Sequence, residues 1–229
     1  MKFIQLDKLN IEYKVTKSKR QTMAFRFLNN GSVNIMVPNK YNQTMADIIV
    51  NKYLDKIIER VNYRKSLIAT YNDNEEFLYL GKKYIIKVIE SKYPKVIISD
   101  NFLYIYTKST DLKVKEKLIY EYLYEQSIDI FNELLYQAFD LMKSELKTYP
   151  KLEIKKFKSV WGLCRIKKNT IALNIDLMHV DLECIKYVIC HELCHFIYPN
   201  HQKEFHVLLN KYIDEKSVKK RLKEYKFKK

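Results

Sequence analysis

The chain has 229 residues, 47% of them apolar, which is enough for one large domain or two small ones with a packed core. Its three glycines and four prolines leave little room for a glycine-rich phosphate loop or a long disordered linker. No run of about 18 uncharged apolar residues occurs, and charged residues stand in the first ten positions where a signal peptide would be apolar. We therefore expect a cytoplasmic protein without a membrane partner.

The formal net charge is +15, from 42 basic and 27 acidic residues. Such an excess is typical of proteins with polyanionic partners, because lysines that neutralise phosphates release counterions. Residues 151–229 hold 18 basic and 9 acidic residues, so a nucleic-acid contact would be expected on this C-terminal part. Only six of the basic residues are arginine, and a general bias toward lysine is an alternative explanation.

The first half of the chain predicts strands alternating with helices. Residues 23–28 and 33–37 alternate in polarity around an Asn-Asn-Gly turn, which predicts a hairpin. Thr44 is the expected cap of a helix whose apolar face extends to Val61. A second strand pair is expected at 77–89 and 96–106. Asp111 then begins a long helix that ends before Pro150.

The last third predicts three short strands followed by helices. The strands are expected at 154–159, 163–166 and 170–175. Asp181 is the expected cap of a helix that runs to about Tyr198, where Pro199 prevents its continuation. A final amphipathic helix, with Phe205, Leu208, Leu209, Tyr212 and Ile213 on one face, leads into a lysine-rich tail.

The predicted helix contains the H-E-x-x-H pattern as His191-Glu192-Leu193-Cys194-His195. Residues four apart lie on one face of a helix, so both imidazoles can bind one Zn²⁺. Glu192 is rotated by about 100° from His191 and can reach a metal-activated water instead of the metal. Zinc lowers the pKa of such a water toward about 7, and Glu192 as general base would take its proton during attack on a carbonyl.

His201 is the expected third ligand, because a catalytic zinc site has three protein ligands and an open position. Pro199 and Asn200 end the helix just before it, so the chain can turn back toward the metal. The spacing is that of metzincins, but Tyr198 replaces their glycine and no methionine follows His201, which disfavours a true metzincin. Glu204 is the alternative third ligand. One Zn²⁺ per chain is the expected cofactor.

Two further groups of residues have candidate roles at this site. The four cysteines, at positions 164, 184, 190 and 194, are expected to be reduced, and small buried hydrophobic residues are favoured over metal or redox roles. Nothing in the sequence fixes the residue that stabilises the oxyanion, for which Tyr198, His206 and Tyr212 are candidates.

The sequence resembles the YgjP-like metallopeptidase family, a group of small zincins related to SprT-like proteases, over nearly its whole length. The motifs that carry the resemblance are Ser18-Lys19-Arg20, Asn30-Gly31-Ser32-Val33, Tyr79-Leu80-Gly81, the segment from Ser159 to Cys164, Leu173-Asn174, and His191 to His201 with Phe205. The resemblance implies that the three histidines are the zinc ligands and Glu192 the catalytic base. Val160 and Leu163 replace an arginine and a serine of the family pattern.

These observations together predict an α+β fold, with a strand-rich N-terminal region containing helices at 1–110 and a compact zincin-like metallopeptidase core at 111–229. The predicted function is zinc-dependent hydrolysis of peptide bonds in peptide or protein substrates. One alternative is the same enzyme acting on DNA-bound proteins. The other is a non-catalytic zinc-binding accessory protein, which would require a closed four-ligand site.

Overall fold

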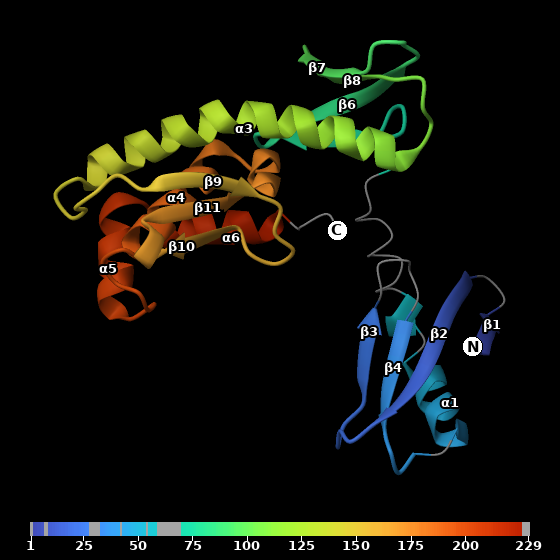
Figure 1. Cartoon of the computed structure of the whole chain (residues 1–229). Helices are drawn as coiled ribbons and strands as arrows, with labels where there is room; N and C mark the ends of the chain where they lie inside the picture. Colours follow the sequence, from blue (N-terminus) through green and yellow to red (C-terminus); the bar gives the residue numbers. More distant parts are fainter. Residues whose placement is uncertain are drawn as a thin grey trace. The chain divides into compact units, whose positions relative to one another are not determined.

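The computed structural model describes residues 2–6, 9–27, 33–41, 43–53, 55–58 and 70–225. The chain forms two compact units, one of Met1–Ala69 with Lys228–Lys229 and the other of Thr70–Phe227. Both contain helices and sheets, which confirms the α+β class (Figure 1). The expected start of a catalytic core at residue 111 stays a prediction. The second compact unit begins earlier, at Thr70, because the strands before residue 111 share a hydrophobic core with the helices after it.

The first unit is built on a four-stranded sheet with the strand order β1-β2-β4-β3. Its elements are β1 (Lys2–Leu6), β2 (Leu9–Ser18), β3 (Ala24–Phe27), β4 (Val33–Pro38) and α1 (Gln43–Lys52). The antiparallel pairing of β3 with β4 confirms the predicted hairpin, although its turn lies outside the described residues. Val33, Ile35 and Val37 alternate inward and form a small core with Ile57.

Two sequence predictions for this unit were wrong or incomplete. Strands β1 and β2 were not predicted, although β2 pairs in parallel with β4 in the middle of the sheet. Helix α1 begins at Gln43, so Thr44 lies inside the helix and not at its cap. The expected end of this helix at Val61 lies outside the described residues.

The second unit begins with another four-stranded sheet, in the order β5-β6-β8-β7. Its strands are β5 (Glu76–Tyr79), β6 (Lys82–Ile89), β7 (Lys95–Ser99) and β8 (Phe102–Tyr106). The run expected at 77–89 is therefore two strands, because Leu80 and Gly81 both have positive φ angles, of 48° and 77°, and reverse the chain. Strands β6 and β8 are parallel neighbours, which alternation alone does not predict.

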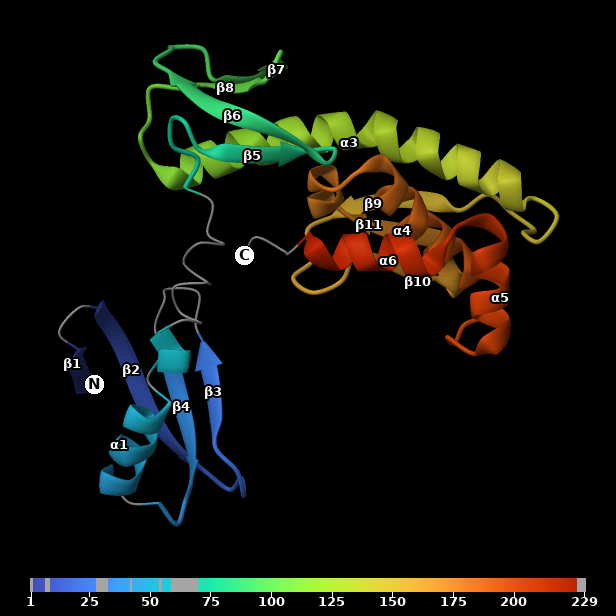
Figure 2. The same ribbon diagram turned by 180° about the vertical axis from the view of Figure 1, so that it is seen from behind.

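Helix α3 (Leu112–Met142) joins this sheet to the rest of the unit (Figures 1 and 2). Asp111 caps it as predicted, accepting a hydrogen bond of 2.9 Å from the Lys113 N–H. Its buried stripe is Lys115, Ile119, Leu123, Ser127, Phe131, Leu135, Ala138 and Met142. Helical spacing in the sequence predicts a stripe that includes Leu118, Tyr122, Leu134, Leu135 and Phe139, and of these only Leu135 is fully buried. One side of α3 packs against β7 and β8, and another against β9 and α4, so a single core runs through the unit.

The C-terminal part is a small sheet covered by helices. Its elements are β9 (Lys151–Lys155), β10 (Gly162–Arg165), η1 (Ile166–Lys168), β11 (Thr170–Asn174), η2 (Ile175–His179), α4 (Leu182–Cys194), α5 (Lys203–Tyr212) and α6 (Glu215–Glu224). The sheet order is β10-β11-β9, with β11 antiparallel to β10 and parallel to β9. Helix α4 is central and packs against α3, α5, α6, β10 and β11. Strand β9 starts before the expected residue 154, and α6 was not predicted.

Two interactions hold the start of α4, its own N-cap and a contact with the turn between β5 and β6. The Asp181 carboxylate caps the helix by accepting a hydrogen bond of 2.9 Å from the Cys184 N–H, as predicted. Gly81, at the turn between β5 and β6, lies against this cap, and a Cβ at Gly81 would be 2.9 Å from the Asp181 Cβ. The adjacent Leu80 N–H donates to the Met178 carbonyl at 2.8 Å. The β5–β6 turn therefore positions the helix that carries the H-E-x-x-H residues. Within the described ranges, no helix is long and apolar enough to cross a membrane.

Candidate metal centre

Three histidine side chains meet where α4 ends and α5 begins. His191 lies in the last turn of α4, His195 is its C-terminal cap residue, and His201 lies in the loop that leads to α5. One ring nitrogen from each lies within 4.8 Å of the other two, a spacing that one metal ion can bridge. The Nε2 atoms of His191 and His201 are 2.9 Å apart. Tetrahedral zinc with ligands at about 2.0 to 2.1 Å holds its nitrogens a little over about 3 Å apart, so the His191–His201 separation is close to that of two zinc ligands.

The loop geometry explains how His201 reaches the other two rings. The helix ends at Cys194, earlier than the expected Tyr198, and the Tyr198 N–H still bonds the Cys194 carbonyl at 2.9 Å. This last turn brings Pro199 to the end of the helix, where the chain reverses. Below the three rings lies the fully buried Phe205, whose ring centroid is 4.7 to 4.9 Å from each of theirs. It forms an apolar floor for the cluster.

His191 and His195 are held as neutral imidazoles, the form that binds a metal. Burial, together with the nearby His195 and His201, lowers the pKa of His191 to about 4. Burial also lowers the pKa of His195. The Nδ1 of His195 lies 3.2 Å from the Tyr198 carbonyl, which fixes its tautomer and leaves Nε2 for the metal. The Nδ1 of His191 is buried and has no hydrogen-bond partner among the described residues.

Glu192 is buried against strand β10. It is 6% exposed, and a Cβ at Gly162 would lie 2.7 Å from its Oε1 and 2.8 Å from its Cγ. Glycine is therefore the residue that leaves room for this carboxylate. Burial raises the pKa of Glu192 to about 7, against a hydrogen bond from the Cys164 backbone that lowers it. A carboxylate with a pKa near neutrality is suited to exchange protons at physiological pH.

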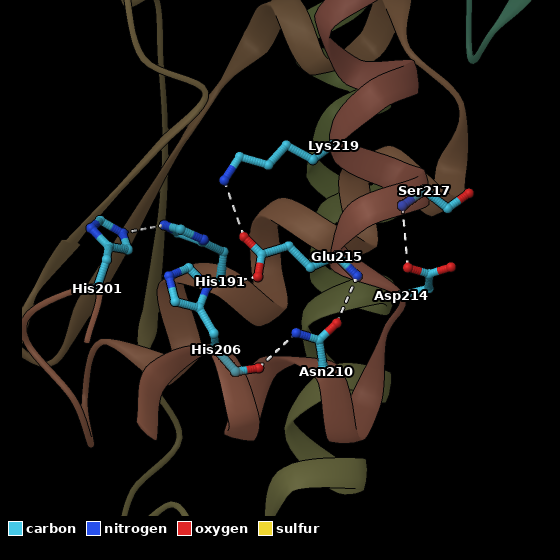
Figure 3. Close-up of polar contacts among 8 residues, drawn as sticks. All are labelled: His191, His201, His206, Asn210, Asp214, Glu215, Ser217 and Lys219. Atoms are coloured by element: carbon cyan, nitrogen blue, oxygen red, sulfur yellow. Dashed lines mark hydrogen bonds and ion pairs between the residues drawn. The ribbon is translucent and has the colours of Figure 1, made fainter. Parts of the chain in front are cut away.

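A second polar cluster lies beside the histidines, where α5 meets α6 (Figure 3). The buried Glu215 accepts hydrogen bonds from His206 Nδ1 at 2.7 Å and from Lys219 Nζ at 3.1 Å. The Glu215 N–H donates to the Asn210 side chain at 3.2 Å, and Asn210 in turn donates to the His206 carbonyl at 2.8 Å. The sequence reasoning missed Glu215, because nothing local distinguishes it from the other glutamates of a helical start.

The remaining candidates from the sequence are Glu204, Tyr212 and the cysteines. Glu204 is exposed and does not belong to the group of converging ligand atoms. Tyr212 bonds Glu145 at 3.5 Å. Cys184, Cys190 and Cys194 are buried free thiols, as expected for small core residues, and Cys164 is partly buried. Burial raises the pKa of each thiol, to about 11 for Cys190 and about 12 for the other three, so they stay protonated and apolar in character.

Comparison with known proteins identifies the class of enzyme. Residues 21–225 match the model of the YgjP-like metallopeptidase domain, so the protein is a peptidase that depends on a metal ion, for which zinc is usual. The chain belongs to the YgjP-like metallopeptidase family, which confirms the resemblance seen in its motifs.

Solved structures of lower similarity include two metallopeptidase zymogens. That of Pyrococcus abyssi abylysin is 24% identical, with a TM-score of 0.37, and the match covers 40% of this chain and 90% of that one. That of Methanocaldococcus jannaschii jannalysin is 22% identical, with a TM-score of 0.37 and coverage of 41% and 88%. No curated protein matches the chain.

Proposed function

We propose that the protein is a zinc-dependent peptidase in which His191, His195 and His201 hold one metal ion and Glu192 is the general base. The observation that carries this proposal is the convergence of three imidazoles on one point, next in sequence to a buried carboxylate whose pKa is raised to about 7. Three ligands leave a fourth position open, as a hydrolytic site requires. The substrate is a peptide or an unfolded protein segment.

When bound, zinc supplies Lewis acidity that activates water and polarises a carbonyl. The chain supplies the other parts of the reaction. Glu192 accepts a proton from the attacking water at its carboxylate and can pass it to the leaving amine, and Gly162 and the Cys164 N–H keep that carboxylate in place. The hydrogen bond between His195 Nδ1 and the Tyr198 carbonyl holds one ligand ring in its orientation.

The alternative of a structural zinc site is disfavoured by the ligand set. A structural site would have four protein ligands, and the converging group within the described ranges contains three. Cys190 and Cys194, the nearest cysteines in sequence, are at most 1% exposed and pack in the hydrophobic core instead.

A second candidate function is cleavage of proteins bound to DNA. It is favoured by three exposed lysines of α6, Lys216, Lys220 and Lys223, whose spacing of four and three residues places them on one helix face. Binding of duplex DNA that weakens steeply with salt, and that is lost when the three lysines are replaced by alanine, would support it. Salt-insensitive binding would remove it.

The main proposal is tested by metal content and hydrolysis measured together. We expect the purified protein to contain one zinc per chain and to cleave an unfolded protein such as denatured casein. A chelator should abolish the cleavage, and added zinc should restore it. A protein that keeps a full complement of zinc but cleaves no unfolded or peptide substrate would contradict the proposal.

A further inference from the structure

Two of the candidate ligands, His191 and His195, differ in the hydrogen-bond partner of the Nδ1 atom. A histidine that binds zinc through Nε2 carries its proton on Nδ1, and this N–H normally donates to a carboxylate, a carbonyl or water. His195 has such a partner in the Tyr198 carbonyl. His191 has none within hydrogen-bond distance in the described part of the chain, although its Nδ1 is buried. A buried donor without compensation is costly, so some other feature must favour the metal-bound form of His191.

A negative charge is available on this side of His191. Figure 3 shows the His191 ring between His201 on one side and the Glu215 carboxylate with Lys219 on the other. Glu215 is 7% exposed. Burial acts to raise its pKa, but the hydrogen bonds from His206 and Lys219 outweigh burial and lower it, so the carboxylate is ionised at neutral pH.

The charges of this cluster act on His191 in opposite directions. The carboxylate of Glu215 favours added positive charge on the ring, whereas the ammonium of Lys219, which lies 3.1 Å from that carboxylate, opposes it. A metal ion bound at Nε2 also adds positive charge to the ring. The same two charges must therefore favour and oppose metal binding, respectively.

We propose that Glu215 is a positioning residue of the metal centre, whose buried carboxylate balances the charge of a metal held on His191 and favours the ring with its proton on Nδ1. The contacts from α5 hold this carboxylate in place. His206 Nδ1 and the Asn210 side chain, four residues apart on α5, bond the side chain and the backbone of Glu215. Helix α6 thus contributes to a site whose ligands all precede it in the chain. This inference rests on the proposed function of the three histidines.

The experiment measures the zinc dissociation constant at pH 7 by competition with a chelating dye, for the full-length protein and three variants. Glu215→Gln removes the charge but keeps the size and an oxygen acceptor for His206, and we expect affinity to fall about 10- to 100-fold. Lys219→Met removes the opposing charge, and we expect affinity to rise. Glu204→Gln makes the same charge change at an exposed position and should leave affinity unchanged.

The opposite changes in zinc affinity that we expect for Glu215→Gln and Lys219→Met distinguish an electrostatic role of Glu215 from a structural one. If Glu215 only holds α5 and α6 together, Glu215→Gln and Lys219→Met should both destabilise the metal-free protein, and neither should tighten zinc binding. That result, or unchanged affinity in Glu215→Gln, would overturn the inference. Zinc binding by His191→Ala equal to that of wild type would instead show that the ligand set itself is wrong.

Discussion

A Cβ at position 162 would lie only 2.7 Å from the Oε1 atom of Glu192, so the position of this carboxylate depends on the absence of a side chain at Gly162. Strand β10 and helix α4 approach one another at this point, and the Cys164 N–H of the same strand bonds the carboxylate. The strand therefore acts as a template for the position of Glu192.

Replacing Gly162 by alanine should displace this carboxylate without touching the histidines. Because a shift of about 1 Å in a catalytic group can cost about 100-fold in rate, we expect peptide hydrolysis to fall by at least that factor, with zinc content unchanged. Leu163→Ala, on the exposed side of the same strand, is the control and should retain activity. Wild-type turnover in Gly162→Ala would show that Glu192 tolerates displacement or has no catalytic role.

Replacing Glu192 by glutamine should separate catalysis from metal binding. The amide preserves size, and the three imidazoles remain, so zinc content and thermal stability should change little. Loss of a positioned base costs about 10²- to 10⁴-fold, and we expect the upper end because the same group orients the attacking water. The measurement is the cleavage rate of an unfolded protein beside zinc per chain. A variant as fast as wild type would exclude Glu192 as the base.

Alanine at His191 or His195 should abolish stoichiometric zinc binding, because two remaining nitrogens make a poor site. His201→Ala should weaken binding strongly, whereas Glu204→Ala should not, since Glu204 lies outside the group of converging ligand atoms. Zinc per chain after dialysis against a weak chelator distinguishes the variants. The reverse order for His201 and Glu204 would mean that the third ligand has been assigned wrongly.

The cap of α4 should make stability depend on pH. Burial acts to raise the pKa of Asp181, but hydrogen bonds from Cys184 and Tyr225 and the charge of Arg221 outweigh burial and lower it. A lowered folded-state pKa means that the stabilisation is complete above the ordinary value of about 3.9 and is lost as pH falls through the folded value.

Urea unfolding at pH 7, 4 and 3 tests this dependence. Asp181→Ala should cost about 0.5 to 2 kcal/mol at pH 7, and its difference from wild type should shrink at pH 3. Asp181→Asn keeps the cap without a titrating group and serves as the control, so its stability should lack this pH-dependent contribution. A constant difference between wild type and Asp181→Ala across the three pH values would contradict the assignment.

Local signals in the sequence predicted much of this architecture, and non-local pairings account for most of what was missed. Asp111 and Asp181 were identifiable because an N-cap needs only its own helix. The parallel neighbours of β6 and of β9, by contrast, are each the second strand of the hairpin that follows, and alternation gives no partner. The break at Leu80 was missed because a non-glycine residue with positive φ has no composition signal of its own.

In the candidate site, too, the local features were predictable from the sequence and the non-local ones were not. The H-E-x-x-H spacing and the loop to His201 are local, and the structure brings these three rings together as the spacing predicted. Their role as ligands stays a proposal. Gly162 and Glu215, which lie 30 and 23 residues from Glu192, gain their meaning only from the packing of β10 and α6 around α4. No pattern within either segment indicates that packing.

The three histidines lie within positions 191 to 201, so the loop that a metal ion would close is short. Closing a short loop removes little conformational entropy from the unfolded chain, and the hydrophobic core of the unit extends from Phe77 to Leu222 without these rings. The proposed metal ion would therefore bind locally to a fold whose stability does not depend on it. Depletion of zinc should leave an inactive but folded protein, whose peptidase activity is restored when zinc is added.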